Sequence, residues 1–209
     1  MVISVGIDMT QSVKPCSLVV LKNKEVGEVK DIADDKEIVK FTFSEHPKVV
    51  AIDSPLFLPN GLCCLESESV CKCTPISSAK GRICERLLSK RGISSYYTTK
   101  KTFIKRMIYR SIELKRQFER QGLEVIEIYP YASWMTLFGK LPKKTTPEGL
   151  SARKDKLQTV LTNMALVRTH DQADAAIAAY TGYLYAIREA QGVGDVSEGF
   201  LWIPTKKGT

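Results

Sequence analysis

The sequence predicts an α/β fold with one mixed β-sheet, in which three antiparallel strands are followed by parallel strands and helices cover both faces. Two observations support this class. The first three apolar runs are joined by short connections, whereas the later strand patterns alternate with helical patterns. In addition, residues 48–53 (KVVAID) form a continuous apolar run, which is typical of a parallel strand between two layers of helices. The 209 residues of the chain are enough for one such domain.

The N-terminal part is predicted to form three strands linked as hairpins. Residues 2–8 (VISVGID) are a buried strand, residues 17–22 (SLVVLK) are a second strand, and residues 25–32 (EVGEVKDI) are a third, more exposed one. Asn23 and Lys24 form the short turn between the second and third strands.

An irregular segment interrupts the middle of the chain. A short helical pattern at 34–45 precedes the parallel strand, and regular patterning is then lost over residues 57–100. That stretch holds five cysteines and only a short helix around 82–90. We therefore expect a single domain over residues 1–209 with an irregular, cysteine-rich insertion.

Helices dominate the C-terminal half. Thr102 is predicted to cap a helix that runs to Gly122, with one apolar and one basic face, and residues 123–129 (LEVIEIY) are the next strand. The tail at 198–205 (EGFLWIPT) adds an edge strand or a covering segment. The further helices are predicted at about 131–138, 148–163 and 171–190. Because crossovers are right-handed, this order leaves few topologies, and one of them is the ribonuclease-H-like sheet with the first strand at its centre.

Three predicted strands carry an acid at or near their carboxyl ends: Asp8, Asp53 and Glu127. Open α/β sheets bind ligands at this edge, so we expect the three side chains to converge there. Taken singly, Asp8 and Asp53 could begin turns, and Glu127 could face solvent. Taken together, clustered carboxylates are costly without a cation, which favours a functional role.

A fourth acidic signal opens the last predicted helix, at residues 170–175 (HDQADA). Asp171 and Asp174 are three residues apart and therefore point to one side of the helix. Helix capping is the structural alternative for both. The alanines that follow would let this helix approach the sheet closely and bring the two aspartates to the acids at its edge.

The acidic cluster and the overall charge together predict a metal-dependent nuclease. Magnesium and manganese prefer carboxylate oxygens, and two such ions stabilise the attacking and leaving oxygens of phosphodiester cleavage. The chain has 31 Lys and Arg against 23 Asp and Glu, a net charge of +8, which favours nucleic acid as partner. An acidic pocket in a basic protein fits hydrolysis of DNA or RNA.

Seven stretches of the chain, in order, resemble a predicted-nuclease family, the domain of unknown function 429 of the ribonuclease-H-like superfamily. They are VGID at 5–8, AIDSPL at 51–56, GRICERLL at 81–88, VIEIYPYASW at 125–134, PKKTTPEGLSAR at 142–153, HDQADAAIAA at 170–179 and EGFLWIP at 198–204. The start of the last helix also looks like that of Holliday-junction resolvases of the RuvC type. The resemblance implies that Asp8, Asp53, Asp171 and Asp174 are metal ligands, with Glu127 as an addition specific to the family.

Basic residues are candidates for contacts with substrate phosphates. Lys143, Lys144 and Arg153 flank a predicted helix start at 145–147 (TTP), and a solvated basic loop is the alternative. Arg82 either contacts phosphate or forms a local ion pair with Glu85.

Other side chains near the predicted site have two interpretations each. His170 either assists proton transfer or neighbours the helix cap. Three aromatic residues either stack on unpaired bases or lie in the core: Tyr129, Tyr131 and Trp134.

The cysteines leave three interpretations open. Five of the six lie close together: Cys63, Cys64, Cys71, Cys73 and Cys84. No pair has the C-x-x-C spacing of a zinc knuckle, and two adjacent cysteines are awkward for one tetrahedral site. Zinc bound by three or four of them, one or two disulfides, and inert buried thiols are the alternatives. Bound zinc would be structural and would order the 57–100 segment.

Several classes of protein fit the sequence less well. The length argues against a two-lobed nucleotide-cleft enzyme, and no apolar stretch is long enough to span a bilayer. We expect no signal peptide, a cytoplasmic location, and a homodimer if the substrate is branched. Two alternatives to the nuclease are a non-catalytic nucleic-acid-binding module and a small-molecule phosphotransferase or phosphatase, although no glycine-rich phosphate loop supports the latter.

Overall fold

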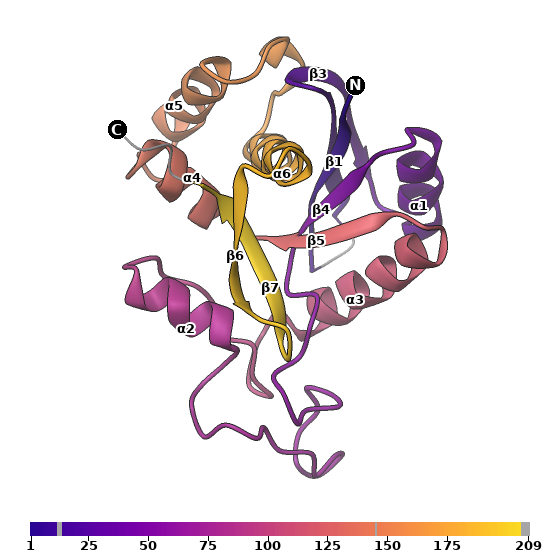
Figure 1. The fold of residues 1–209 in the computed structure, drawn as a ribbon, viewed down its shortest axis with the longest axis vertical. Helices are drawn as coiled ribbons and strands as arrows, with labels where there is room; N and C mark the ends of the chain where they lie inside the picture. Colours follow the sequence, from indigo (N-terminus) through magenta and orange to yellow (C-terminus); the bar gives the residue numbers. More distant parts are fainter. Residues whose placement is uncertain (12–13, 145, 206–209) are drawn as a thin grey trace.

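A seven-stranded mixed sheet runs through the computed structural model of the chain, which describes residues 1–11, 14–144 and 146–205 (Figure 1). The strands are β1 (Ile3–Asp8), β2 (Cys16–Lys22), β3 (Glu25–Ile32), β4 (Val49–Asp53), β5 (Glu124–Ile128), β6 (Ala190–Asp195) and β7 (Gly199–Pro204). Their order across the sheet is β3-β2-β1-β4-β5-β7-β6. The first three strands are antiparallel, whereas β1, β4, β5 and β7 run parallel, which confirms the predicted mixed sheet.

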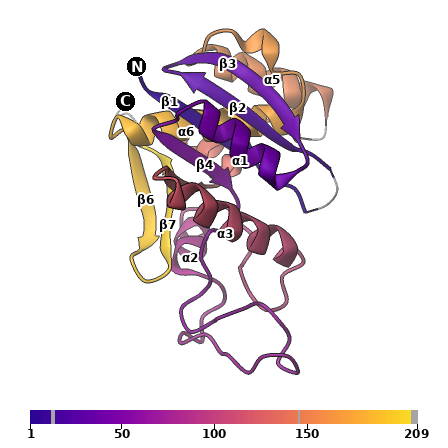
Figure 2. The same cartoon turned by 90° about the vertical axis from the view of Figure 1, so that its right-hand side faces the viewer.

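Helices cover both faces of this sheet. They are α1 (Asp35–Ser44), α2 (Ile83–Lys90), α3 (Lys105–Arg120), α4 (Pro130–Phe138), α5 (Pro147–Gln158) and α6 (His170–Ala186). α6 lies across β1, β2 and β4 with α4 and α5 beside it, and α1 and α3 pack on the opposite face (Figure 1 and Figure 2). The predicted two-sided arrangement is confirmed. None of the described helices is both long and apolar enough to cross a membrane.

Strand alternation divides β1 and β4 between two cores. Val5 and Ile7 of β1 face α1 and α3, as do Val50 and Ile52 of β4. The residues between them therefore face α6, because successive side chains of a strand point to opposite faces. As a result, both strands end with an aspartate on the side covered by α6.

The approach of α6 to the sheet depends on small residues. A Cβ atom at Gly6 would lie 2.1 Å from the carbonyl oxygen of Ala175 and 2.3 Å from the backbone nitrogen of Ala179. Ser4 donates a hydrogen bond of 2.8 Å from its hydroxyl to the carbonyl oxygen of Ala179. The backbone of α6 is thus in direct contact with β1, and only glycine at position 6 permits this contact.

The C-terminal hairpin differs from the prediction. The helix expected over 171–190 ends at Ala186, and residues 190–195 (AQGVGD) form β6 instead. The tail pairs with β5 as the parallel strand β7, so that β6, and not the tail, is the edge strand. Two glycines and a weak apolar alternation hide β6 in the sequence.

Two other helices also have boundaries that differ from the prediction. The helix expected from Thr102 begins at Lys105, after the cap residue Ile104. The helix expected over 148–163 ends at Gln158, and a short 3-10 helix follows at Met164–Leu166.

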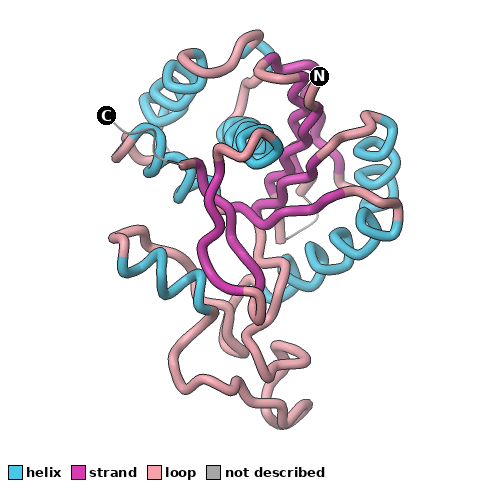
Figure 3. The backbone as a smooth tube through the Cα atoms, in the orientation of Figure 1, coloured by secondary structure: helices cyan, strands magenta, loops and turns pink. Residues whose placement is uncertain are grey.

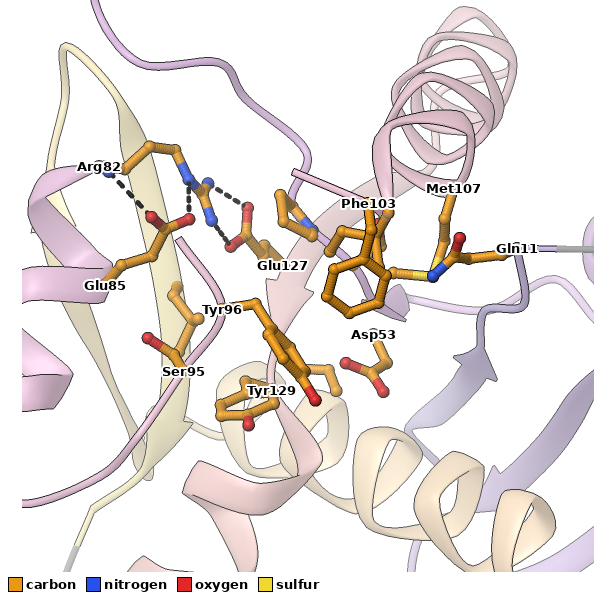
Figure 4. Close-up of a pocket in the computed structure, with 15 residues that line it drawn as sticks. Gln11, Asp53, Arg82, Glu85, Ser95, Tyr96, Phe103, Met107, Glu127 and Tyr129 are labelled. Carbon is orange, nitrogen blue, oxygen red and sulfur yellow. Dashed lines mark hydrogen bonds and ion pairs between the residues drawn. The ribbon is translucent and has the colours of Figure 1, made fainter. Parts of the chain in front are cut away.

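The irregular segment projects from the sheet. Residues 57–100 are all described and contain one helix, α2, close to the predicted position. The rest of the segment is loop and extends beyond α2 and α3 (Figure 2 and Figure 3). It lies next to the start of α3, where it borders the carboxyl ends of β4 and β5 (Figure 4).

Candidate active site

Asp8 and Asp53 end two neighbouring parallel strands. They are direct partners in the β1–β4 register, and their carboxyl groups lie close enough to affect each other's pKa. Asp8 is only 6% exposed, whereas Asp53 keeps partial access to a pocket. The predicted convergence at the carboxyl ends of the strands is confirmed for this pair.

α6 adds Asp174 to the pair. The close contact of α6 with β1 places this buried carboxylate near enough to Asp8 and Asp53 to perturb both. Trp134 of α4 donates a hydrogen bond of 2.9 Å from Nε1 to Oδ1 of Asp174 and holds it in place. Asp171 lies one turn earlier on α6, near the cluster but 56% exposed.

Helix capping does not account for Asp174, whereas Asp171 lies in the first turn of α6, where an acid suits the helix dipole. The cap residue is Thr169, whose hydroxyl accepts a hydrogen bond of 3.1 Å from the backbone nitrogen of Gln172. Asp174 is bound instead by Trp134 and by the ammonium group of Lys144. The expectation that the small residues of α6 bring its acids to the sheet edge is therefore confirmed.

The crowded carboxyl groups hold protons more tightly than usual. Burial, followed by the negative charge of Asp174, raises the pKa of Asp8 to about 7. Burial and the charge of Asp8 raise the pKa of Asp53 well above its ordinary value. Such a cluster becomes fully ionised at neutral pH only when a nearby positive charge stabilises it.

Lys144 supplies one positive charge to the cluster. Its ammonium group contacts Asp174 and lies 3.3 Å from Oδ1 of Asp171. Partial burial opposes the charge, but Asp174 more than compensates and raises the pKa of Lys144. The lysine predicted to contact phosphate thus lies at the carboxylates themselves.

Hard divalent cations suit this donor set. The groups that meet at the sheet edge are carboxylate oxygens, which magnesium and manganese prefer. The carboxyl groups of Asp8 and Asp53 carry raised pKa values, which is the direction expected of buried acids that lie close to other acids. The residues that could supply such oxygens are Asp8, Asp53 and Asp174, with Asp171 at the rim.

Glu127 does not join the aspartates. In the β4–β5 register, Asp53 pairs with Ile128, so these two side chains lie on the same face of the sheet. Glu127 is the residue before Ile128 and therefore points to the other face. There it accepts two hydrogen bonds, of 2.7 and 2.6 Å, from the guanidinium group of Arg82 and one from the backbone of Leu56. The expectation that Glu127 converges with Asp8 was wrong for this reason.

Arg82 is a buried structural residue. It is 1% exposed, and its Nε donates a hydrogen bond of 2.9 Å to Glu85 while both Nη groups bind Glu127 (Figure 4). The local ion pair with Glu85 is therefore the alternative that the structure favours. A contact between Arg82 and substrate phosphate does not fit this geometry.

Arg153 organises the basic loop from within. Its Nη1 donates hydrogen bonds of 3.1 and 2.9 Å to the carbonyl oxygens of Pro142 and Gly149, and its guanidinium group lies over the Trp134 ring. Arg153 is only 6% exposed, so the phosphate contact predicted for it does not fit either. Lys143 on the same loop is exposed.

The predicted helix start after this loop is partly observed. Thr146 is the cap residue of α5 and accepts a hydrogen bond of 3.1 Å from the backbone nitrogen of Gly149. Thr145, which was part of the same prediction, lies outside the described residues.

The predicted aromatic and histidine candidates are dispersed. Trp134 is a core residue that positions Asp174, and Tyr131 is 39% exposed. Tyr129 lines the pocket beside Asp53, where burial raises its pKa. For His170, burial and the charge of Arg153 lower the pKa, and its Nδ1 is buried without a hydrogen-bond partner among the described residues.

A pocket opens beside Asp53, bordered by an aromatic pair that the sequence analysis did not single out. Tyr96 and Phe103 are 62% and 67% exposed, and their rings meet edge to face with centroids 5.3 Å apart. Figure 4 shows both rings over the space into which the Asp53 carboxyl group points. The signal in the sequence that could have pointed to this pair is the presence of aromatic residues in and beside an irregular, basic segment.

The comparisons with known proteins identify the fold. No family model and no curated protein matches the chain, so the resemblance to the domain of unknown function 429 finds no support there. Among solved structures, RuvC from Thermus thermophilus in complex with Holliday junction substrate is similar, with a TM-score of 0.51 and 11% identity. That match covers 96% of this chain and 100% of the RuvC chain. A second structure of Thermus thermophilus RuvC has a TM-score of 0.50 and 12% identity over 95% and 99% of the two chains. The chain therefore has the ribonuclease-H-like fold that these resolvases share.

Proposed function

We propose that the protein is a nuclease that hydrolyses phosphodiester bonds of DNA or RNA with the help of divalent magnesium or manganese. The observation that carries the proposal is the meeting of Asp8, Asp53 and Asp174 at the carboxyl ends of β1 and β4. Such a cluster fits metal-assisted phosphoryl chemistry, and the fold is the one of RuvC.

The ligands in the proposal are Asp8, Asp53 and Asp174, with Asp171 at the rim. Ions held by these residues would supply an activated water molecule and positive charge at the leaving oxygen. Asp8 and Asp53 must release the protons that the raised pKa values retain. Trp134 fixes one oxygen of Asp174 by its hydrogen bond and leaves the other for a cation.

Lys144 has a second role in this proposal. Its ammonium group occupies the position beside Asp171 and Asp174 where positive charge is needed before ions bind. With ions held by the carboxylates, Lys144 would be free to contact a phosphate oxygen of the substrate. Glu127 and Arg82 support the sheet edge and take no part in the chemistry.

Nucleic acid with unpaired bases is the substrate class that the surroundings favour. Exposed Tyr96 and Phe103 border the pocket beside Asp53 and can stack on bases that have left a duplex. One of the similar RuvC structures holds a Holliday junction, which is a branched DNA. We therefore infer that a branched or partly single-stranded substrate is cleaved, and that a two-fold dimer would present two such sites.

A cleavage assay tests the proposal. Purified protein is mixed with labelled single-stranded, duplex and branched DNA and RNA, with magnesium or manganese. We expect wild-type protein to cleave, and Asp8→Asn and Asp174→Asn each to lower the rate by about 100-fold or more, since metal ions contribute several kcal/mol to such reactions. An Asp8→Asn/Asp53→Asn double variant, purified identically, controls for contaminating nuclease.

A matched control is Asp155→Asn, which alters an exposed carboxylate on α5, away from the cluster. It should cleave like wild type. Wild-type turnover in both Asp8→Asn and Asp174→Asn would refute the proposal. Binding that weakens with salt but never leads to cleavage, with any metal, would instead indicate a non-catalytic nucleic-acid-binding module.

A further inference from the structure

We propose that Cys63, Cys64, Cys71 and Cys73 bind one structural zinc ion in the projecting segment. Their four sulfur atoms all lie within 4.8 Å of one another, and among the described residues this is the one group of three or more potential ligand atoms so close together. The site is separate from the carboxylate cluster. It involves no residue of the proposed nuclease chemistry.

The distances between the sulfur atoms fit tetrahedral coordination. Cys63 Sγ lies 3.5 Å from Cys71 Sγ, and Cys64 Sγ lies 3.9 Å from Cys73 Sγ. A tetrahedron with zinc–sulfur bonds of about 2.3 Å has edges of about 3.8 Å. The two measured separations lie on either side of this value, and both exceed the bonded sulfur–sulfur distance of about 2.05 Å in a disulfide.

The chain path explains how an unusual spacing makes one site. The ligands have the pattern C-C-x6-C-x-C, which lacks the C-x-x-C pair of common zinc knuckles. A turn begins at Ser67, whose carbonyl oxygen accepts hydrogen bonds of 2.9 Å from the backbone nitrogens of Val70 and Cys71. This turn folds the second pair of cysteines back onto the first pair.

The remaining two cysteines belong elsewhere. Cys84 is buried in α2, where it packs with Leu88 and Val193. Cys16 is buried in the core beside β1. Of the cysteines predicted as a group, Cys84 is therefore excluded from the site.

The charge around the cysteines suits a zinc–thiolate centre. Four thiolates on one zinc ion carry a net charge of −2, and the ammonium group of Lys100 donates a hydrogen bond of 2.6 Å to the carbonyl oxygen of Cys71. Thiolate is the form that binds metal.

A metal also answers a structural need of this segment. Residues 66–80 have no helix or strand, and nearly all of them are exposed or half-buried, so burial of apolar surface contributes little to their order. Contacts with α3 hold the start of the segment, where Tyr109 accepts a hydrogen bond of 2.6 Å from the backbone of Leu65 and Lys105 pairs with Glu66 at 2.8 Å. Structural zinc supplies folding free energy to segments of this kind.

Elemental analysis and native mass spectrometry of the full-length protein test the proposal. We expect one zinc ion per wild-type chain and none in a Cys71→Ser/Cys73→Ser double variant. Cys16→Ala and Cys84→Ala remove cysteines outside the cluster and should both retain the ion. Replacement of zinc by cobalt should produce the intense thiolate-to-cobalt absorption that only cysteine coordination gives.

A second measurement on unaltered protein covers the case in which the double variant does not fold. Titration of wild type with a mercurial thiol reagent should release one zinc ion as four thiols react, and removal of zinc by a chelator should make residues 57–80 sensitive to protease. Zinc-free protein with two disulfides in non-reducing mass spectrometry, or zinc retained by the double variant, would overturn the proposal. So would iron in place of zinc.

Discussion

A carboxyl group buried among other carboxyl groups, as Asp8 is, prefers to keep its proton. Because its pKa is about 7 in the folded protein and 3.8 as an ordinary side chain, the folded state binds this proton more tightly than the unfolded state. Between about pH 4 and pH 7 the unfolded chain has lost the proton and the folded chain has not. Raising the pH through this window therefore lowers the free energy of unfolding, and the loss is complete above the folded pKa.

The substitution Asp8→Asn should remove this penalty in metal-free protein. We expect the free energy of unfolding of the variant, relative to wild type, to increase by about 2–4 kcal/mol between pH 4 and pH 8, since one pKa unit is about 1.4 kcal/mol. Urea unfolding with a chelator at both pH values measures it. Asp155→Asn provides the reference slope, and a difference between Asp8→Asn and wild type that does not change with pH would contradict the argument.

Arg82 presents the opposite situation, a buried cation between two carboxylates. Its guanidinium group binds Glu85 and Glu127, and all three residues are at most 2% exposed. Arg82→Met retains much of the volume but leaves both carboxylates without a cationic partner. Breaking a buried ion pair in this way costs about 3–5 kcal/mol, so we expect a loss of that order in urea unfolding.

The control for this prediction is Arg116→Met on α3. Arg116 pairs with Glu113 at 3.7 Å, and both side chains are at least 50% exposed, so the loss should stay below about 1 kcal/mol. Equal stability of Arg82→Met and wild type would show that the network around Glu127 does not stabilise the fold. Arg82 would then become a candidate for substrate contact again, and Glu127 a candidate metal ligand.

These residues also show how far the sequence predicts the site. Strand ends and their acids predict that Asp8 and Asp53 meet, because that follows from parallel pairing alone. The face of the sheet on which Glu127 lies depends on the β4–β5 register, because a shift of one residue moves a side chain to the opposite face. The cysteine cluster depends on a turn in a segment without periodicity, so the sequence leaves its geometry open.

At the scale of elements, the contact between β1 and α6 brings the two halves of the acidic cluster together. Gly6 touches the backbone of α6, and no side chain on the helix can move aside to accommodate a methyl group there. Gly6→Ala should push α6 away from the sheet and cost about 3 kcal/mol or more of stability. Because Asp174 moves with the helix, the proposed nuclease activity should also fall.

Gly27→Ala on β3 is the matched control for this substitution. A Cβ atom there would lie 3.5 Å or more from the flexible side chain of Lys22, which is ordinary contact. It should leave stability unchanged or raise it slightly. Thermal unfolding of the two variants compares them directly, and equal melting temperatures for Gly6→Ala and wild type would show that the helix–sheet contact tolerates expansion.

The elements themselves are predicted unequally well. The first three strands, β4 and β5 carry strong apolar patterns, and their positions agree with the prediction to within one or two residues. β6 has two glycines in six residues and therefore lacks a clear local strand pattern. It forms a hairpin with β7, which follows after a short turn, and tertiary contacts stabilise this hairpin. β7 pairs with β5, which lies far from it in the sequence. Hydrophobic periodicity does not indicate which distant segments pair.

At the scale of the whole molecule, an acidic cluster lies within a chain of net charge +8. In the nuclease proposal, a polyanion is attracted to the basic surface and reaches the carboxylate cluster, where bound cations would neutralise its phosphates. Binding of nucleic acid should therefore weaken steeply with salt, because each neutralised phosphate releases about one counterion. A linear fall of the logarithm of affinity with the logarithm of salt concentration is the expected result.

Exposed Lys143, on the loop that carries Lys144 to the cluster, should contribute to this slope. In catalytically inactive Asp8→Asn protein, with calcium replacing magnesium, Lys143→Ala should weaken binding of branched DNA and reduce the salt slope by about 1. Lys40→Ala removes the same charge from α1, on the face opposite α6, and should change neither. Fluorescence anisotropy across a salt series measures both variants. Both substitutions remove one positive charge, so the change in net charge affects the two variants alike and only a local contact with nucleic acid can make their salt slopes differ. Equal salt slopes for Lys143→Ala and Lys40→Ala would therefore mean that the nucleic acid approaches from another side.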